Sequence, residues 1–297
     1  MNKLISIVTQ GKLIAILIVS LTNVVAFFAP FFALVSGSII GLIALRKGTN
    51  DAMIVFALSA IPVTVMIQEE FGRPAIALPL LLFLSLPIIL SALLLNKTQS
   101  QGVAILTATA VSALFVITLR LLFQDIDLFW TEWLEKTVKY VKGATVNGFS
   151  REGSLQFVTG LAASTMTLCM ILTILISRWL QSLAFNPGGF SKEFYALRLP
   201  KAAALITLTI LTAYISLTYG KGNLLSDLLM IAAITYAFQG LATLHGATKT
   251  VELPRMWLVI TYLSLFLLPR FSIALLAFIG LADSHFNFRS RKKVESP

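Results

Sequence analysis

The feature that most constrains this chain is a long charge-free run near its N-terminus. Residues 13–45 contain no Asp, Glu, Lys or Arg. As one helix this 33-residue run would measure ~50 Å, whereas a single crossing of the ~30 Å hydrocarbon layer needs ~20 residues. Pro30 lies near the middle of the run, and proline suits the start of a helix better than its interior. The run therefore predicts two membrane helices, 13–28 and 30–45.

Similar apolar runs continue to the C-terminal region. Of the 297 residues, 57% are hydrophobic and 12% are charged, about half the charge of a typical soluble domain. This excludes a soluble enzyme and a disordered chain, and the single cysteine, Cys169, excludes a disulfide scaffold. The further runs are 52–68, 74–96, 98–119, 153–177, 202–220, 228–248, 256–269 and 271–282. The sequence predicts an all-α, polytopic transmembrane helical bundle that forms a single integral membrane domain over 1–297.

Lys and Arg predict the orientation of the chain. The net charge of +10 lies mostly in short connections, which favours cytoplasmic loops over a nucleic-acid site. The last two runs are too short to cross alone, so 256–282 is either one kinked crossing or a re-entrant pair. A re-entrant pair keeps the basic tail 284–297 inside and gives the stronger charge bias. We therefore expect eight full spans, a C-terminal broken hairpin, and both termini on the cytoplasmic side of the membrane.

Two connections are long enough to carry structure. Segment 124–154, outside in this topology, has apolar residues at helical spacing and two tryptophans, Trp130 and Trp133. This pattern predicts an amphipathic helix in the outer interface, either a spacer that covers the end of the bundle or a lid over an outward cavity. Its apolar positions are Ile126, Trp130, Trp133, Leu134, Val138 and Val141.

Segment 178–201, inside, predicts an interfacial elbow. Residues 186–189 (Asn-Pro-Gly-Gly) form a turn signal, after which Ser191 is placed to cap a short helix. Phe190 and Phe194 would share one side of that helix, with Arg198 beside them. The elbow is either a structural bend or a docking surface for a cytoplasmic protein or anionic lipid headgroups.

Small residues form a stripe within the first apolar run. Ala29, Ala33, Gly37 and Gly41 recur at every fourth position, which lets another helix backbone approach closely. We expect the stripe to pack against a helix of this chain or of a partner subunit.

Ionisable residues at membrane depth are the candidates for a ligand site. Arg120, Asp227 and Arg270 qualify, and the predicted topology puts all three in the outer half of the membrane. Arg270 has no charged neighbour in sequence. We therefore expect it to point into the bundle beside Asp227 and to line an outward-facing polar cavity. Tyr236 and Gln239, on the same predicted helix as Asp227, could hydrogen-bond a ligand or a neighbouring helix.

Catalytic patterns are weak in this sequence. The two histidines, His245 and His285, lie far apart, and the consecutive residues Asp283, Ser284 and His285 cannot adopt triad geometry. The sequence has no HExxH, CxxC or phosphate-binding glycine motif. We expect no enzyme activity, no cofactor and no metal site.

Two stretches resemble a known family. One is 178–190, RWLQSLAFNPGGF, continuing to Pro200, and the other is Gly280–Asp283 followed by residues 286–289, FNFR. Together they are similar to the YybS-like integral membrane proteins of bacteria, in a proteobacterial branch. The family has no established activity, so the resemblance implies no catalytic residues. Its membrane core in turn resembles the substrate-binding subunits of energy-coupling-factor transporters and the rod-shape protein MreD.

Two functions fit these observations. The first is a small-molecule binding or transport component with a polar site in the outer half of the membrane. The second is a non-transporting scaffold that acts on a membrane or cytoplasmic protein through the elbow and the tail. A stabilising ligand would favour the first function, and a stable protein complex without ligand would favour the second.

Overall fold

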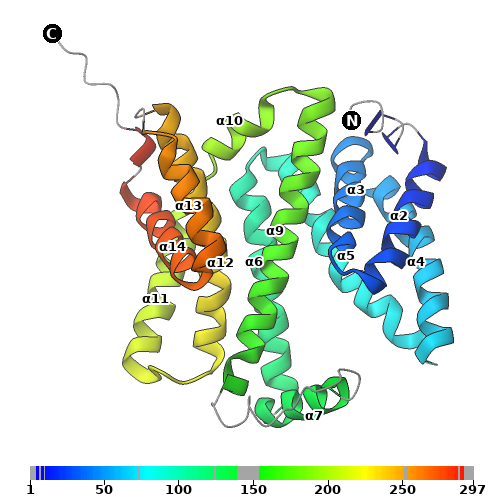
Figure 1. Cartoon of the computed structure of the whole chain (residues 1–297), viewed down its shortest axis with the longest axis horizontal. Helices are drawn as coiled ribbons and strands as arrows, with labels where there is room; N and C mark the ends of the chain where they lie inside the picture. The colour runs from blue at the N-terminus through cyan, green and yellow to red at the C-terminus, as the bar shows by residue number, and fades with distance from the viewer. Residues whose placement is uncertain are drawn as a thin grey trace. The chain divides into compact units, whose positions relative to one another are not determined.

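The structure is a computed structural model of the chain, and it describes residues 5–6, 8–9, 11–71, 74–123, 125–138, 154–250, 253–286 and 288–290. All regular elements in these ranges are helices (Figure 1). They are α2 (Lys12–Phe28), α3 (Phe32–Lys47), α4 (Thr49–Phe71), α5 (Pro74–Thr98), α6 (Gln101–Leu122), α7 (Ile126–Val138), η1 (Ser154–Phe157), α9 (Val158–Phe185), α10 (Gly189–Tyr195), α11 (Lys201–Leu217), α12 (Leu224–Thr250), α13 (Met256–Leu267), α14 (Pro269–Phe286) and η2 (Phe288–Ser290).

The helix breaks fall where the sequence predicts them. The 13–45 run is divided between α2 and α3, and α2 ends before Pro30, with Ala29 outside helical geometry. The last apolar region is divided at Leu268, and Pro269 begins α14, the position at which a missing N–H is tolerated. Figure 1 shows α13 and α14 as separate helices whose chain direction changes at this break. The choice between one kinked crossing and a re-entrant pair stays a prediction.

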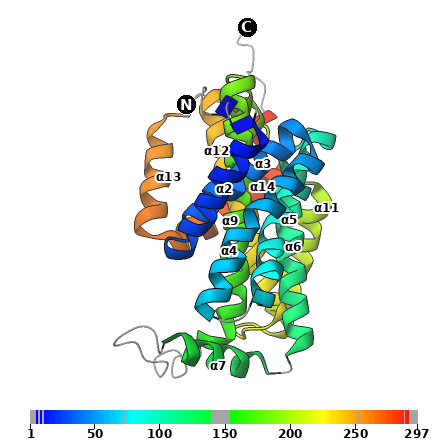
Figure 2. The same cartoon turned by 90° about the vertical axis from the view of Figure 1, so that its right-hand side faces the viewer.

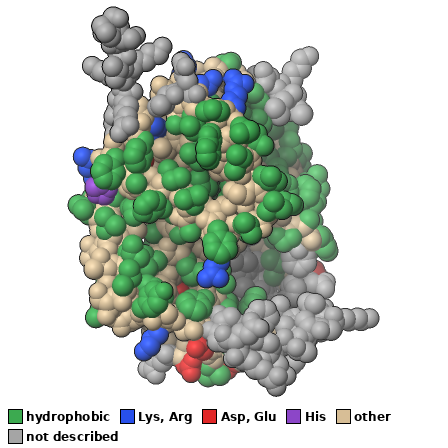
Figure 3. Space-filling view, turned by 60° about the vertical axis from the view of Figure 1, so that its left-hand side comes forward, with side chains coloured by type: hydrophobic (Ala, Val, Ile, Leu, Met, Phe, Trp, Pro, Cys, Tyr) green, Lys and Arg blue, Asp and Glu red, His purple; other side chains and the backbone are tan. Residues whose placement is uncertain are grey.

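Four helical segments are long and apolar enough to cross a membrane. Within the described residues these are Thr49–Ile67, Gln101–Leu122, Leu155–Phe185 and Leu224–Thr250. Shorter apolar helices are Lys12–Ala26, Ser85–Thr98, Lys201–Leu217 and Met256–Leu267. Hydrophobic side chains also dominate the face seen in Figure 3. A helical membrane protein is thereby indicated, with four candidate spans where the sequence analysis expects eight.

The helices group into two compact units. Unit 1 comprises Met1–Ala108 and Cys169–Arg198, and unit 2 comprises Thr109–Leu168 and Leu199–Pro297. Helices α6 and α9 each contribute residues to both units. The sequence analysis expects a single domain and does not predict this grouping.

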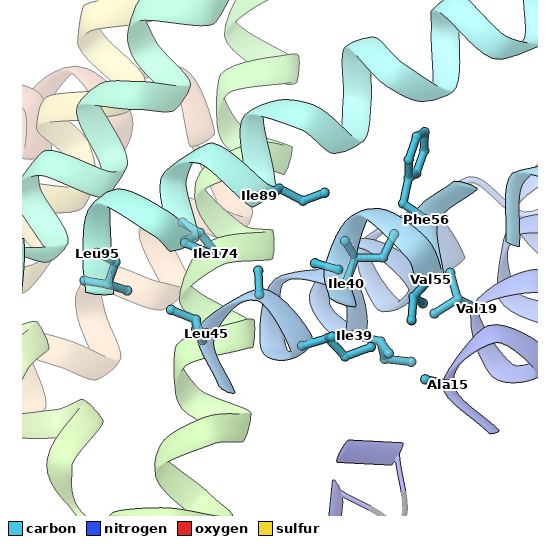
Figure 4. Packing of buried hydrophobic residues seen from close by; sticks show 14 of the residues in the cluster. Ala15, Val19, Ile39, Ile40, Leu45, Val55, Phe56, Ile89, Leu95 and Ile174 are labelled. Atoms are coloured by element: carbon cyan, nitrogen blue, oxygen red, sulfur yellow. The ribbon is translucent and has the colours of Figure 1, made fainter. Parts of the chain in front are cut away.

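Unit 1 has an extended apolar core, which Figure 4 shows from close by. It joins α2, α3, α4, α5 and the start of α6 to the later part of α9. Its buried members include Val19, Ile40, Val55 and Ile174, each at most 2% exposed. Because these side chains leave no polar group unsatisfied, burial of apolar surface and close packing suffice to stabilise the unit.

The prediction that the small-residue stripe faces another helix holds for Gly37 and Gly41 but not for Ala29 and Ala33. A Cβ on Gly37 would lie 2.9 Å from Thr173 Cγ2, and one on Gly41 would overlap Ser177 Oγ, so both glycines face α9 at close range. Ala33 is exposed, and Ala29 lies outside α2 and α3. The stripe fails there because the break near Pro30 interrupts the helical periodicity on which the prediction depends.

Unit 2 is held together by a close helix–helix contact. A Cβ on Gly240 of α12 would overlap the main-chain oxygen of Leu276 of α14, and a Cβ on Gly280 of α14 would overlap that of Tyr236. Only glycine allows the two backbones to approach in this way.

Candidate functional site

A buried ion pair in unit 2 joins the end of α6 to the start of α12, beside the start of α9. Arg120 lies in the last turn of α6 and Asp227 in the first turn of α12. The Nε of Arg120 donates to Oδ2 of Asp227 at 2.6 Å. The Asp227 side chain is fully buried, and the Arg120 side chain is 18% exposed. A buried charge is costly without a counter-charge, and each member of this pair compensates the other, whereas the sequence analysis expected Arg270 beside Asp227.

The start of α9 contacts the same carboxylate. A Cβ on Gly160 would lie 2.8 Å from Asp227 Oδ1 and 3.1 Å from its Cα. Any side chain at position 160 would therefore displace Asp227. The sequence analysis missed Gly160, because a glycine in an apolar run gives no sign of which helix approaches it.

An apolar layer lies one turn away from the pair. Val116, Ala163 and Ile231 are buried together, and each lies three or four residues from Arg120, Gly160 or Asp227 along its own helix. In an α-helix this spacing puts them on the same face as the pair. The layer excludes water from one side of the pair, which strengthens its electrostatic interaction.

The pair is incompletely hydrogen-bonded. A bidentate Arg–Asp contact would add a second bond from an Nη atom to the other carboxylate oxygen. Here Arg120 Nη2 and Asp227 Oδ1 are both buried and form no hydrogen bond of good geometry among the described residues, although the main-chain N–H of Gly160 lies close to the Asp227 carboxylate. A buried donor and a buried acceptor are thus left unsatisfied in one site, and each carries a desolvation penalty until a partner arrives.

Helix α7 runs across this end of α6 and α9, as Figures 1 and 2 both show. The buried indole of Trp130 donates from Nε1 to Thr159 Oγ1 at 2.7 Å, next to Gly160. Phe123 and Phe129 extend the aromatic contacts, with ring centroids 4.3 Å apart. The helix that the sequence predicts within 124–154 is therefore present over Ile126–Val138, while Val141 lies outside the described residues.

The expected five-residue site is not one cluster. Tyr236 and Gln239 follow Asp227 by nine and twelve residues, a rise of roughly 14 and 18 Å along α12. Both are buried, but they lie in a different layer of the helix. Arg270 is exposed and forms no ion pair among the described residues. The prediction that Arg270 points into the bundle beside Asp227 is therefore wrong. Arg120 is the partner of Asp227. Arg270 directly follows the helix break, and this position leaves its side chain outside the packed interior.

Gln239 belongs to a second polar cluster. Its Nε2 donates to Asp283 Oδ2 at 3.2 Å and to Ser284 Oγ at 3.1 Å. Its Oε1 accepts the main-chain N–H of Leu199 at 3.0 Å. Arg289 Nη2 donates to Asp283 Oδ2 at 2.6 Å. Gln239 thus stabilises the fold by linking α12 to α14 and to the start of α11.

Asp283 and Arg289 were not recognised as partners from the sequence. The Asp283 side chain is fully buried and that of Arg289 is 8% exposed. Arg289 is therefore not a free charge of the tail, as expected for 284–297, and residues 291–297 lie outside the described ranges. The available signal was the six-residue spacing of two opposite charges on either side of the end of α14, which by itself is weak.

The elbow is held by an ion pair within unit 1. Arg178 Nε donates to Glu193 Oε2 at 2.8 Å, and a second bond joins Nη2 to Oε1. Gln101 Nε2 donates to the same carboxylate at 3.3 Å. The Arg178–Glu193 pair is bidentate, unlike the Arg120–Asp227 pair, so the elbow is fixed by its own side chains.

The short helix of the elbow starts earlier than predicted. It begins at Gly189, after Gly188 with φ 81°, so Ser191 is not its N-cap. The Asn-Pro-Gly-Gly turn ends in a left-handed residue, which glycine adopts readily. Phe190 and Phe194 stack at 5.9 Å between centroids, and both are half-buried. Arg198 follows them and is also half-buried.

No group of His, Cys, Asp and Glu in the described ranges has the arrangement of a metal site. One pocket of unit 1, between Lys12, Lys47 and Asp51, has a volume of about 10 Å³, room for about one water molecule. Arg270 is not among the residues that line this pocket.

Comparison with protein-family models, curated proteins and solved structures finds no match for the chain. The resemblance to the YybS-like family therefore remains a prediction, and so do its likenesses to transporter subunits and MreD.

Proposed function

We propose that the protein is a membrane-embedded small-molecule binding component of a transport process, with Arg120 and Asp227 as its ligand-binding residues. One observation supports this most strongly. The pair is buried at the end of a candidate span, yet one donor and one acceptor remain without partners. Ionisable groups at membrane depth are typically functional, and most buried polar atoms in proteins have a hydrogen-bond partner.

The charges of the site define a ligand class. Arg120 and Asp227 neutralise each other, so a ligand with a net charge would be buried without a counter-ion. Nη2 needs an acceptor and Oδ1 needs a donor. A neutral polar or zwitterionic molecule that offers both groups side by side fits these requirements.

Helix α7 supplies the cover of this site. Trp130 fixes it to Thr159 by a hydrogen bond that one rotation of the indole would break. In the proposed topology α7 lies at the outer surface of a bacterial inner membrane, with both termini cytoplasmic. Release of α7 would then open the site toward the outside.

Matched arginine-to-lysine substitutions test the proposal. Arg120→Lys keeps the charge beside Asp227 but removes the Nη2 donor, and Arg178→Lys makes the same change in the bidentate pair of unit 1. Native mass spectrometry of the gently purified protein should show a bound small molecule on the parent chain and on Arg178→Lys, and at least tenfold less on Arg120→Lys. Equal retention by both variants, or an empty parent protein, would contradict the proposal.

The elbow favours a second candidate, a non-transporting scaffold. Its stacked pair, Phe190 and Phe194, lies on a helix that a bidentate ion pair holds in place. A preorganised aromatic pair is suited to docking a protein. Phe190→Ser/Phe194→Ser should then dissociate a stable complex that forms without any ligand, whereas loss of bound ligand at Arg120→Lys with the complex intact would favour the first candidate.

A further inference from the structure

One end of unit 1 concentrates exposed basic side chains that no acidic residue neutralises. The acidic side chains Asp51 and Glu193 at this end are paired with Lys12 and Arg178. Three further lysines are exposed and form no ion pair among the described residues. They are Lys47 in the last turn of α3, Lys97 in the last turn of α5, and Lys192 on α10.

Hydrogen bonds bring the three lysines to the same end. Asn96 Nδ2 donates to the main-chain oxygen of Leu45 at 3.1 Å, which joins the end of α5 to the end of α3. Gln101 at the start of α6 donates to Glu193, which joins the α5–α6 turn to α10. Each lysine is thus one or two residues from a group that takes part in these contacts.

The ring of Phe185, the last residue of α9, lies at the end of α3 that carries Arg46 and Lys47. The guanidinium of Arg46 lies over the ring of Phe185 with its central carbon 3.8 Å from the centroid. Trp179 and Phe185 are each 40% exposed near the end of α9. Exposed aromatics and snorkelling cations together are typical of the level at which lipid headgroups meet acyl chains.

We propose that Lys47, Lys97 and Lys192 form a binding site for the phosphate of an anionic phospholipid headgroup. Three ammonium groups at one end of unit 1 concentrate positive charge that attracts an anionic phosphate, and the exposed rings of Trp179 and Phe185 suit contact with the first acyl carbons. A free phosphate ion would use the lysines but would leave the aromatic surface in contact with water. The lipid is therefore the occupant that matches both parts of the site. This site is independent of the Arg120–Asp227 pair.

The experiment compares two triple variants of equal charge. Lys47→Gln/Lys97→Gln/Lys192→Gln alters the site, and Lys201→Gln/Lys221→Gln/Lys249→Gln removes three exposed lysines of unit 2. Each protein is reconstituted in nanodiscs of equal phosphatidylglycerol and phosphatidylcholine, released into detergent, and weighed by native mass spectrometry. Each lysine near an anionic headgroup contributes about fivefold in affinity, so the site triple should bind phosphatidylglycerol on the order of 100-fold more weakly.

Three results would overturn the proposal. They are equal loss of phosphatidylglycerol from both triples, equal retention of phosphatidylcholine on the parent protein, and displacement of the lipid by millimolar inorganic phosphate, which would identify an ion site. Helical circular dichroism of the site triple must match that of the parent chain. If the site triple does not fold, the single variant Lys192→Gln, on the surface of α10, should still lower retention about fivefold, and unchanged retention would overturn the proposal.

Discussion

The two units stabilise themselves in different ways. Unit 1 buries a broad apolar cluster from six helices, and its ion pairs lie at the edge, where Glu193 is 31% exposed and Lys12 is 55% exposed. Unit 2 buries a smaller apolar layer and carries two ion pairs whose aspartates are fully buried. Apolar packing needs no exact partner for each atom, whereas a buried charge does. Arg120 Nη2 and Asp227 Oδ1, which lack partners in the first of these pairs, therefore point to a ligand there.

The largest expected effect separates the two kinds of ion pair. Asp227→Leu leaves Arg120 buried without a counter-charge and should lower the free energy of unfolding by about 3–5 kcal/mol. Glu193→Leu should lower the free energy of unfolding less, because the carboxylate that it removes is 31% exposed and already screened by solvent, although it leaves Arg178, 11% exposed, without its partner. Equilibrium unfolding in detergent micelles measures both values.

A double variant sharpens this test. Arg120→Leu/Asp227→Leu removes both charges and should be more stable than Asp227→Leu alone, since no unpaired charge remains. Similar losses for Asp227→Leu and Glu193→Leu would mean that the two pairs do not differ in the way described.

The next effect compares the glycine contacts of the two units. In unit 2, Gly280→Ala places a Cβ against the main-chain oxygen of Tyr236, which cannot move without shifting α12. In unit 1, Gly41→Ala meets the Ser177 hydroxyl, which can rotate. We expect a loss of about 1–3 kcal/mol for Gly280→Ala and a smaller one for Gly41→Ala. Thermal unfolding of both variants would check the order, and a reversed order would contradict the backbone contact.

The smallest effect concerns the cover of the site. Trp130→Phe keeps an aromatic ring but removes the hydrogen bond to Thr159, so it should cost about 1 kcal/mol. Hydrogen exchange of the α7 amides should accelerate in this variant. Trp133→Phe, at a half-exposed position of the same helix, is the matched control. Equal acceleration in both variants would argue against the Trp130–Thr159 bond as the anchor of α7.

The helices were predictable because their signal is local. Charge-free runs and two prolines locate the helix breaks at Pro30 and Pro269, and aromatic spacing locates α7. The partners of the charged groups were not predictable, since they depend on which helices pack together. Arg120 and Arg270 look equally suitable as partners of Asp227 in the sequence. Only the approach of α6 to α12 selects Arg120, and the same applies to Gln239, whose partner Asp283 is 44 residues away.

The most direct test of the central claim is an experimental density map of the protein in lipid nanodiscs, at a resolution that resolves side chains. We predict a single Nε–Oδ2 contact between Arg120 and Asp227, with density larger than a water molecule bridging Arg120 Nη2 and Asp227 Oδ1. A closed bidentate pair with no additional density would instead satisfy both atoms within the chain. That result would identify the pair as a structural contact and contradict the ligand site.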